Sequence, residues 1–526
     1  MVKLQTLQDV PTKVDAKSIV NKNGVLEVPN SFIRKISPFV SVKDFGAKGD
    51  GITDDTAAIQ AALNIGGHIK GVQGDTYCVT NSGTQNTQDY CLMLTSDTTL
   101  SDMSLKQKDS SNATTMFTVQ NSAENVKLSN ISADGNKANN TITSTSFFTG
   151  GESISNITLS DIRLNNFEGR NIMTQGSPNN GSAFKANNIV ADNIIIQNNG
   201  NKAFQVRASS GVTVNNLQVY SDITNSEYAS ASGFECSFSS DVVASNIIVK
   251  HSQDDYGPGI RVVNGCENIT VSGFYVERGK QGIFVTDSSD VKISNGVVRE
   301  TQASRIASDD LGEQYANKTK NITICNVSML DTNEDEFINL RSSNSTSTPV
   351  KDVIIKDCYF YSTSILKGIS ASADVSSTIE ISTSNNFFTG TDNINIHDGF
   401  QESNILSFFE VSDSSLKGLI FDVPDDDFAV FRLPKNFGSS REGIVSVYVR
   451  TVPFWSSTAA YRQANSSLEF LNNITPSRVE AGSGALTGTT GADGNVTYSV
   501  DNLGNMYLEN RSGVTRQFYV TFLNYI

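Results

Sequence analysis

Acidic, basic and aromatic side chains gather in the middle of this 526-residue sequence. Glu235 precedes Arg261, and the segment between them carries Asp254, Asp255 and Tyr256. Two carboxylates can cleave a glycosidic bond, with retention of configuration when they lie about 5 to 5.5 Å apart and with inversion at about 6.5 to 9.5 Å. We therefore take Glu235, Asp254 and Asp255 as candidate catalytic residues.

Other interpretations of the same residues stay open. A lyase needs a base that removes a proton next to a neutralised carboxylate, and His251, Tyr256 or Arg261 could supply it. Alternatively, Glu235 and Arg261 on neighbouring strands could form a surface pair worth roughly 0.2 to 1 kcal/mol. The acidic segment between them could equally be a solvated loop.

A repeated pattern would position these side chains. From about residue 98, pairs of apolar residues recur on either side of a two-residue bend, and clear copies begin at Val126, Ile157, Val212, Ile269, Ile322 and Val353. The spacing between copies varies. A repeat of roughly 20 to 50 residues with variable length is typical of a solenoid whose insertions form surface loops.

Each copy predicts three short strands. Two of them flank the bend, where an Asn side chain can bond the backbone and stack on its equivalent one coil away. The Asn residues at this bend are Asn130, Asn193, Asn216, Asn246 and Asn326. A third strand lies upstream, as in residues 233–236, 259–262 and 282–285. Three strands per turn give the cross-section of a parallel β-helix.

The register of the third strand decides which side chains face outward. Because side chains alternate along a strand, the residue after each inward apolar one would face solvent. The inward set is Phe204, Phe234, Ile260, Ile283 and Ile338. The outward set is Gln205, Glu235, Arg261, Phe284 and Asn339, and the row two places further is Arg207, Ser237, Val263, Thr286 and Arg341. Neighbours in a row would lie about 4.8 Å apart.

These rows predict a surface on which an extended sugar chain can bind, because it would offer an acid, guanidinium groups, amides and an aromatic ring. To these rows we add Tyr256, which lies in the loop, and Glu277, which lies at the corner of the next coil. The predicted substrate-binding residues are Gln205, Arg207, Tyr256, Arg261, Glu277, Phe284 and Arg341.

Residues 42–63 predict a short strand, a glycine turn and a helix that caps the first coil. The glycines, which permit backbone conformations that other residues resist, are Gly46, Gly49 and Gly51. We expect Thr53 or Asp54 to cap the helix. The carboxylates Asp50, Asp54 and Asp55 are interpreted as turn and cap residues rather than as a catalytic or metal cluster.

Residues 44–63, DFGAKGDGITDDTAAIQAAL, resemble the opening of pectate-lyase-like right-handed β-helix proteins, above all bacteriophage tailspikes that degrade bacterial surface polysaccharide. The resemblance implies a homotrimer that binds and cleaves capsular or O-antigen polysaccharide. It also implies attachment to a phage tail or baseplate protein through the N-terminus, and therefore a place in the virion.

We divide the chain into three parts. Residues 1–38 are the expected N-terminal particle-attachment segment, although a flexible leader fits them equally well. Residues 39–401 are the expected parallel β-helix with its N-terminal capping helix. Residues 402–526 alternate in longer strands and predict an antiparallel β-sandwich. This sandwich could serve end capping, trimerisation or carbohydrate contact, and an end cap is needed because an open β-helix end exposes apolar edges.

Composition excludes several classes of partner. The net charge of −15 argues against nucleic acid, whose binding depends on Lys and Arg. The three histidines lack metal-ligand spacing, so we expect neither a metal nor another cofactor. The six cysteines lack finger spacing and are interpreted as small buried residues. No apolar run approaches the roughly 20 residues of a membrane helix, so membrane insertion is not expected.

The sequence therefore favours an all-β polysaccharide depolymerase that acts by glycoside hydrolysis. Two rivals remain. A polysaccharide lyase would release products with an unsaturated uronic acid, and a non-catalytic adhesion spike would bind the glycan without cleaving it.

Overall fold

The structure is a computed structural model in which the chain forms two compact units. The first is Met1–Phe234 with Phe238–Val243, and the second is Glu235–Ser237 with Ala244–Ile526. The structure describes residues 20–22, 25–27, 39–140, 145–175, 185–221, 232–252, 257–308, 319–331, 336–342, 350–361, 367–373, 379–384, 386–389, 392–396, 406–411, 419–423, 425–432, 442–449, 455–462, 467–473, 477–502 and 505–523. The fold is nearly all β, with a right-handed parallel solenoid of about 9 turns and antiparallel sheets at the C-terminus, as predicted.

The chain enters the first coil through four short elements. They are β3 (Val40–Ser41), the 3-10 helix η2 (Val42–Phe45), β4 (Asp50–Asp54) and α2 (Thr56–Leu63). The strand predicted at residues 42–45 is therefore wrong. Ser41 caps η2 by accepting a hydrogen bond from the Lys43 amide at 3.2 Å, and this turns the chain into a helical turn.

Helix α2 closes the end of the solenoid, as the sequence predicts. It buries Ile59, Ala62 and Leu63, which are at most 1% exposed. The predicted N-caps Thr53 and Asp54 are wrong, because the helix begins at Thr56 and its N-cap position is Asp55. Asp54 nevertheless accepts the Thr56 amide at 3.0 Å, so it still satisfies one of the free amides at the helix start.

The carboxylates before α2 have structural roles, as predicted. Asp50 accepts the amides of Ile52 and Thr53 at 2.9 and 2.7 Å, and these bonds lower its pKa to about 2, the Thr53 amide contributing most. Asp55 is 1% exposed and accepts the Lys48 and Gly49 amides at 2.5 and 3.0 Å. No three metal-ligating side chains cluster in the part of the chain that the structure describes.

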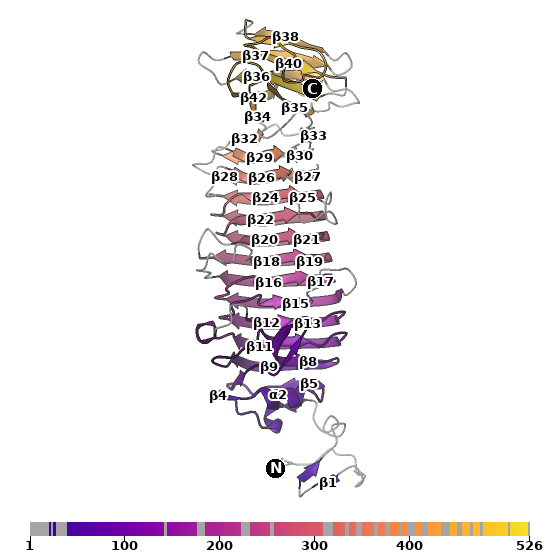
Figure 1. Cartoon of the computed structure of the whole chain (residues 1–526), viewed down its shortest axis with the longest axis vertical. Coiled ribbons are helices and arrows are strands. Elements are labelled where there is room, and N and C mark those ends of the chain that lie inside the picture. Colours follow the sequence, from indigo (N-terminus) through magenta and orange to yellow (C-terminus); the bar gives the residue numbers. More distant parts are fainter. Residues whose placement is uncertain are drawn as a thin grey trace. The chain divides into compact units, whose positions relative to one another are not determined.

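Two sheets form the coils of the first unit (Figure 1). The long-strand sheet contains β5 (Gly67–Lys70), β6 (Thr76–Val79), β9 (Thr98–Gln107), β11 (Glu124–Asp134), β13 (Ser155–Asn165), β15 (Ala186–Gln197) and β17 (Ser209–Ser221). The short-strand sheet contains β7 (Gly83–Gln85), β8 (Gln88–Leu94), β10 (Thr115–Val119), β12 (Ser146–Thr149), β14 (Ile172–Met173) and β16 (Phe204–Arg207). Strands of successive coils pair in parallel, and only β7 and β8 form a hairpin among these elements.

The predicted inward positions form the core. Phe204, Phe234, Ile260, Ile283 and Ile338 are all 0% exposed, which confirms the register of the third strand. In the first unit, Phe117 and Phe147 pack edge to face with ring centroids 5.4 Å apart. Each fully buried large side chain stabilises the fold by about 1.5 to 3 kcal/mol.

Asparagine and aspartate side chains link successive coils at the bends of the long-strand sheet. Asn130 donates to Asp102 at 2.7 Å, and Asn193 donates to Asp161 at 2.6 Å. Asn130, Asn193 and Asn326 have φ of 53°, 55° and 54°, a left-handed conformation that Asn tolerates better than most residues. The predicted stacking of bend residues from coil to coil is therefore confirmed.

The second unit repeats the same coil. Its short-strand sheet contains β20 (Pro258–Val263), β22 (Gln281–Thr286), β24 (Ser304–Ser308), β26 (Glu336–Ser342), β29 (Lys367–Ala373) and β32 (Asp392–Ile396). Its long-strand sheet contains β21 (Glu267–Glu277), β23 (Ser289–Arg299), β25 (Lys320–Leu330), β27 (Val350–Lys356), β28 (Tyr359–Tyr361), β30 (Ile379–Ser384), β31 (Phe387–Thr389) and β33 (Leu406–Val411). Strands β18 (Phe234–Ser237) and β19 (Ser240–His251) contribute residues to both units.

The coils end in a β-sandwich whose strands pair antiparallel, except for the parallel pair of β39 (Val479–Ala481) and β40 (Val496–Val500). Strand β34 (Leu419–Val423) pairs in parallel with β32 and antiparallel with β42. One sheet joins β34, β42 (Arg516–Leu523), β36 (Glu442–Val449), β37 (Trp455–Arg462) and β38 (Ser467–Asn473), and the other joins β35 (Asp427–Arg432), β41 (Asn505–Asn510), β40 and β39. Tyr498 packs edge-on against Phe470 and Phe518 of the opposite sheet, with centroids 6.0 and 6.3 Å apart.

In the N-terminal segment, β1 (Val20–Lys22) and β2 (Val25–Glu27) form an antiparallel pair. All six cysteines are free thiols, and five of them are buried, which agrees with their interpretation as small core residues. Among the described residues, no helix is long and apolar enough to cross a membrane.

Candidate functional site

The predicted outward row of the short-strand sheet exists in the second unit. It runs across four successive strands of that sheet. Arg261 on β20 pairs with Phe284 on β22, and Phe284 pairs with Arg305 on β24. Arg305 in turn pairs with Asn339 on β26. Side chains at these positions face away from the core because their neighbours in sequence, such as Ile260 and Ile283, fill the interior. The row thus presents guanidinium, aromatic, guanidinium and amide groups on consecutive coils.

Glu235 stands next to Arg261, as predicted, but it does not face solvent. Its side chain is 1% exposed, and Oε2 accepts a hydrogen bond from Arg261 Nη1 at 2.9 Å. The Arg261 side chain is 19% exposed. The expectation of a solvent-facing Glu235 is therefore wrong. A buried carboxylate needs a charged or hydrogen-bonding partner, and Arg261 provides one.

Arg261 also contacts an aromatic ring. Its guanidinium carbon lies 5.8 Å from the centroid of Phe284. A cation over a ring is attracted by the ring quadrupole, by about 0.5 to 2 kcal/mol depending on solvation. Arg261 is thereby held between a carboxylate and a ring, with the orientation of its donors fixed before any ligand arrives.

The second predicted row is only partly a surface. Ser237, Val263 and Thr286 are at most 1% exposed. Arg341 on β26 is exposed and belongs to a register row with Thr286 on β22 and Ala307 on β24. Of this row, the second unit therefore offers a ligand only Arg341.

Gln205 and Arg207 lie on β16 in the first unit. They follow the buried Phe204 by one and three places, so both side chains alternate away from the one that fills the core. Gln205 is nevertheless only 3% exposed, so the expectation that it faces solvent is wrong, whereas Arg207 is half-buried. The Arg207 amide donates to Thr174 Oγ1 at 2.9 Å, which ties this strand to the preceding coil.

Glu277 is engaged by another cation. It lies at the end of β21 on the long-strand sheet and accepts from Lys250 Nζ at 3.0 Å, which holds its pKa below the usual range. The Lys250 ammonium also lies 5.1 Å from the ring centroid of Tyr275. Glu277 is therefore part of a surface ion pair, and its predicted role toward a substrate stays a prediction.

The predicted loop residues Asp254, Asp255 and Tyr256 lie outside the described residues. His251, which could serve a lyase as a base, is 5% exposed at the end of β19, and neither ring nitrogen has a hydrogen-bond partner among the described residues. Burial lowers its pKa to about 4, so the ring is neutral at pH 7.

Arg305 is the residue that the sequence reasoning missed in the outward row. The segment Ser304-Arg305-Ile306 has the same inward-outward alternation as the neighbouring coils, and this signal could have found it. A cleft of about 530 Å³ in the first unit was also missed. None of the predicted site residues lines it.

Comparison with known proteins establishes the fold. No protein-family profile matches the chain, and no curated protein matches it. The N-terminal fragment of bacteriophage phi29 gene product 12 shares 18% identity at a TM-score of 0.52, over 72% of this chain and 67% of that one. The tailspike protein of E. coli bacteriophage HK620, in complex with a pentasaccharide, shares 12% identity at a TM-score of 0.44, over 96% of both chains.

An enzyme module is also among the solved structures that match. The A-module of a mannuronan C-5 epimerase from Azotobacter vinelandii shares 18% identity at a TM-score of 0.47, over 68% of this chain and 97% of that one. The solved structures that match this chain thus include bacteriophage proteins and an epimerase module. At these identities the likeness to the phi29 fragment shows a common fold, the parallel β-helix, and nothing more.

Proposed function

We propose that the protein is a phage tailspike that binds a bacterial surface polysaccharide and cleaves its glycosidic bonds. The opening motif at residues 44–63 and the parallel β-helix fold both support this class. The observation that carries the proposal is the row on the short-strand sheet of the second unit. There Arg261 contacts Glu235 on one side and Phe284 on the other.

The row suits an extended glycan because its groups recur at the strand spacing of about 4.8 Å. Arg261 and Arg305 can donate hydrogen bonds to sugar hydroxyls or carboxylates, and the half-buried ring of Phe284 offers an apolar face. Asn339 adds an amide that both donates and accepts. A sugar chain that follows the stacked strands would meet these groups one after another.

In this proposal Glu235 acts in its ionised form. The Arg261 guanidinium at 2.9 Å favours the carboxylate over the neutral acid. An ionised carboxylate suits a nucleophile or a general base, and hydrolysis then needs a separate acid. We assign that acid to Asp254 or Asp255, because both follow β19 closely in the chain.

The remaining proposals rest on the sequence resemblance. They are a homotrimeric assembly, attachment to the phage tail or baseplate through residues 1–38, and a C-terminal sandwich that caps the β-helix, supports trimerisation or contacts carbohydrate. Together they place the protein in the virion, acting at the bacterial surface.

The burial of Glu235 favours a second candidate function. A buried ion pair can hold a binding surface in shape without doing chemistry. A non-catalytic glycan-binding spike would use the same Arg261, Phe284 and Arg305 surface. The two functions differ only in whether the glycan is cut.

The test is to incubate the purified protein with capsular and O-antigen polysaccharides from a panel of bacterial strains. Hydrolysis predicts new reducing ends and shorter chains. This activity should be lost in Glu235→Gln but kept in Glu300→Gln, a matched change in the surface ion pair with Arg278. Products that absorb in the ultraviolet would indicate a lyase instead. Binding without shortening of any polysaccharide would contradict the depolymerase and support the adhesion spike.

A further inference from the structure

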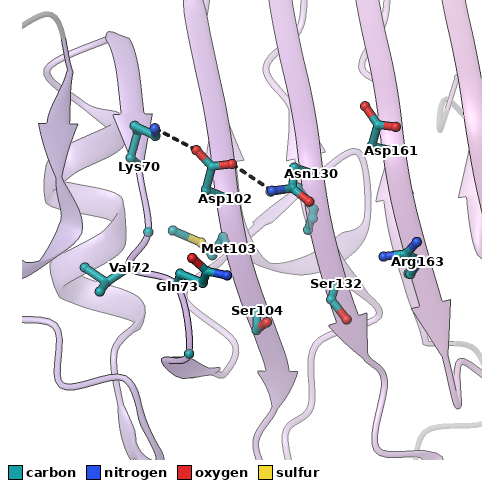
Figure 2. Close-up of a pocket in the computed structure, with 13 residues that line it drawn as sticks. Lys70, Val72, Gln73, Asp102, Met103, Ser104, Asn130, Ser132, Asp161 and Arg163 are labelled. Carbon is teal, nitrogen blue, oxygen red and sulfur yellow. Dashed lines mark hydrogen bonds and ion pairs between the residues drawn. The ribbon is translucent and has the colours of Figure 1, made fainter.

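A cleft of about 530 Å³ opens on the long-strand sheet of the first unit (Figure 2). Two parallel rows of side chains form its base. The bend row contains Asp102, Asn130 and Asp161, and the strand row contains Ser104, Ser132 and Arg163 on β9, β11 and β13. Each row advances by one strand spacing per coil, so a row of three spans roughly 10 Å.

One wall of the cleft is a turn that the fold holds in place. The Gly71 amide donates to the Ser101 carbonyl at 3.1 Å, and a Cβ at Gly71 would meet the Asp102 carbonyl oxygen at 2.5 Å. The Val72 amide donates to the Tyr77 hydroxyl at 3.1 Å. Because the turn is fixed at several points, the cleft exists without a ligand.

Two charged side chains in the cleft are paired with each other, whereas Arg163 has no such partner among the described residues. Lys70 and Asp102 neutralise each other at 2.8 Å, which holds the pKa of Asp102 below its usual range. The Arg163 side chain, by contrast, is exposed and makes no hydrogen bond or ion pair within the described part of the chain. The cleft therefore presents one unused guanidinium, which Figure 2 shows at the end of the strand row, next to Ser132.

The other polar side chains that line the cleft can form hydrogen bonds with hydroxyl groups of a ligand. Ser104, Ser132 and Gln73 line the cleft, and within the described residues their side chains have no protein partner. Asp161 accepts a hydrogen bond from Asn193 at Oδ1 and keeps Oδ2 available. Hydroxyls can donate to this oxygen and accept from the amide of Gln73.

These features identify the chemistry of the occupant. A metal ion is disfavoured because Lys70 already neutralises Asp102. A nucleic-acid base is disfavoured because no aromatic residue lines the cleft for stacking. An apolar ligand would bury the polar side chains of both rows without giving them hydrogen-bond partners. What fits is a hydroxylated ring that carries one carboxylate.

We propose that this cleft is a second glycan site, which binds an acidic sugar with its carboxylate on Arg163 and its hydroxyls on Ser104, Ser132 and Asp161. The inference extends the proposed function to a surface outside the predicted catalytic row. It does not require cleavage, so its test is independent of Glu235.

The test measures binding of glucuronate, galacturonate and N-acetylneuraminate to the full chain by ligand-observed NMR and calorimetry. Glucose and galactose serve as neutral probes, and inorganic phosphate and sulfate as plain anions. Arg163→Gln should weaken the acidic sugars by about tenfold or more, since it removes a charged hydrogen bond. Arg163→Lys should keep part of the affinity.

Lys127→Gln is the matched control. It removes one exposed positive charge from β11 and does not touch the cleft, so affinity should change little. Ser132→Tyr should block the site by filling it. The inference is overturned if Arg163→Gln binds as the natural protein does, if neutral sugars bind equally well, or if phosphate and sulfate match the acidic sugars. Loss of depolymerisation in Glu235→Gln would leave these outcomes unchanged.

Discussion

At the scale of single residues, the environment of each charge separates the residues that hold a site from those that decorate a surface. Arg261 contacts both a buried carboxylate and an aromatic ring, whereas Arg278 makes an exposed pair with Glu300 at 3.3 Å. The two pairs look alike in the sequence. Their energetic consequences differ, because removing one partner of a buried pair leaves a charge in a poorly solvated place.

Arg261→Met should therefore destabilise the protein by about 3 kcal/mol, because it removes the guanidinium that neutralises Glu235. The matched change Arg278→Met should cost less than about 1 kcal/mol, since that pair is solvated. Combining Arg261→Met with Glu235→Gln should recover part of the loss. Urea unfolding midpoints measure all three variants, and equal losses from Arg261→Met and Arg278→Met would contradict the buried pair.

His251 predicts a dependence of stability on acid. Its pKa is about 4 in the folded protein and about 6.5 when unfolded, so the unfolded chain takes up the proton first as pH falls. The stability of the native protein should fall between pH 6.5 and pH 4, by roughly 3 kcal/mol, relative to a variant without this group. His251→Phe provides that variant. Parallel pH profiles for the two proteins would show that His251 is not buried neutral.

At the scale of elements, alternation along the strands allowed correct prediction of the third-strand register. Phe234, Ile260 and Ile283 are all fully buried, and the bend asparagines do link the coils. Such features can be predicted because they depend only on the alternation of side chains along one strand and on pairing with the adjacent coil. Arg305 was missed because the inward position before it is Ser304, where the neighbouring coils have the apolar residues Ile283 and Ile338.

Burial and concavity were harder to predict than register. Whether Glu235 is exposed depends on what covers its strand, and alternation does not report that. The cleft in the first unit needs the turn after β5 to lie against β9, and its base comes from three coils. Residues so far apart in sequence give no local signal, although Arg163 lay in a correctly predicted strand.

A second row of linked asparagines, at the start of the long strands, predicts a graded effect of substitution. Asn156 has φ of 57°, donates to Asn125 at 3.0 Å and accepts from Asn188 at 2.7 Å. Asn156→Ala should cost about 2 to 3 kcal/mol, because it loses both bonds and strains the left-handed backbone. Asn156→Gly also loses both bonds, but glycine adopts a positive φ without strain, so its cost in stability should be smaller. Unfolding midpoints decide this, and an Ala variant as stable as the Gly variant would remove the conformational argument.

At the scale of the whole molecule, the proposed trimer makes a simple prediction. A homotrimer should have three times the chain mass of 56.7 kDa in solution. Light scattering coupled to size-exclusion chromatography measures this mass directly. A monomer at all concentrations would exclude the assembly that the sequence resemblance implies, while leaving the fold and the outward row intact.

The central claim is that the glycan lies along the row of Arg261, Phe284 and Arg305. The most direct test is an experimental structure with a bound oligosaccharide repeat from a polysaccharide that the protein binds. We expect successive sugars against these three side chains, on consecutive coils of the short-strand sheet. An oligosaccharide bound elsewhere, with this row untouched, would contradict the account.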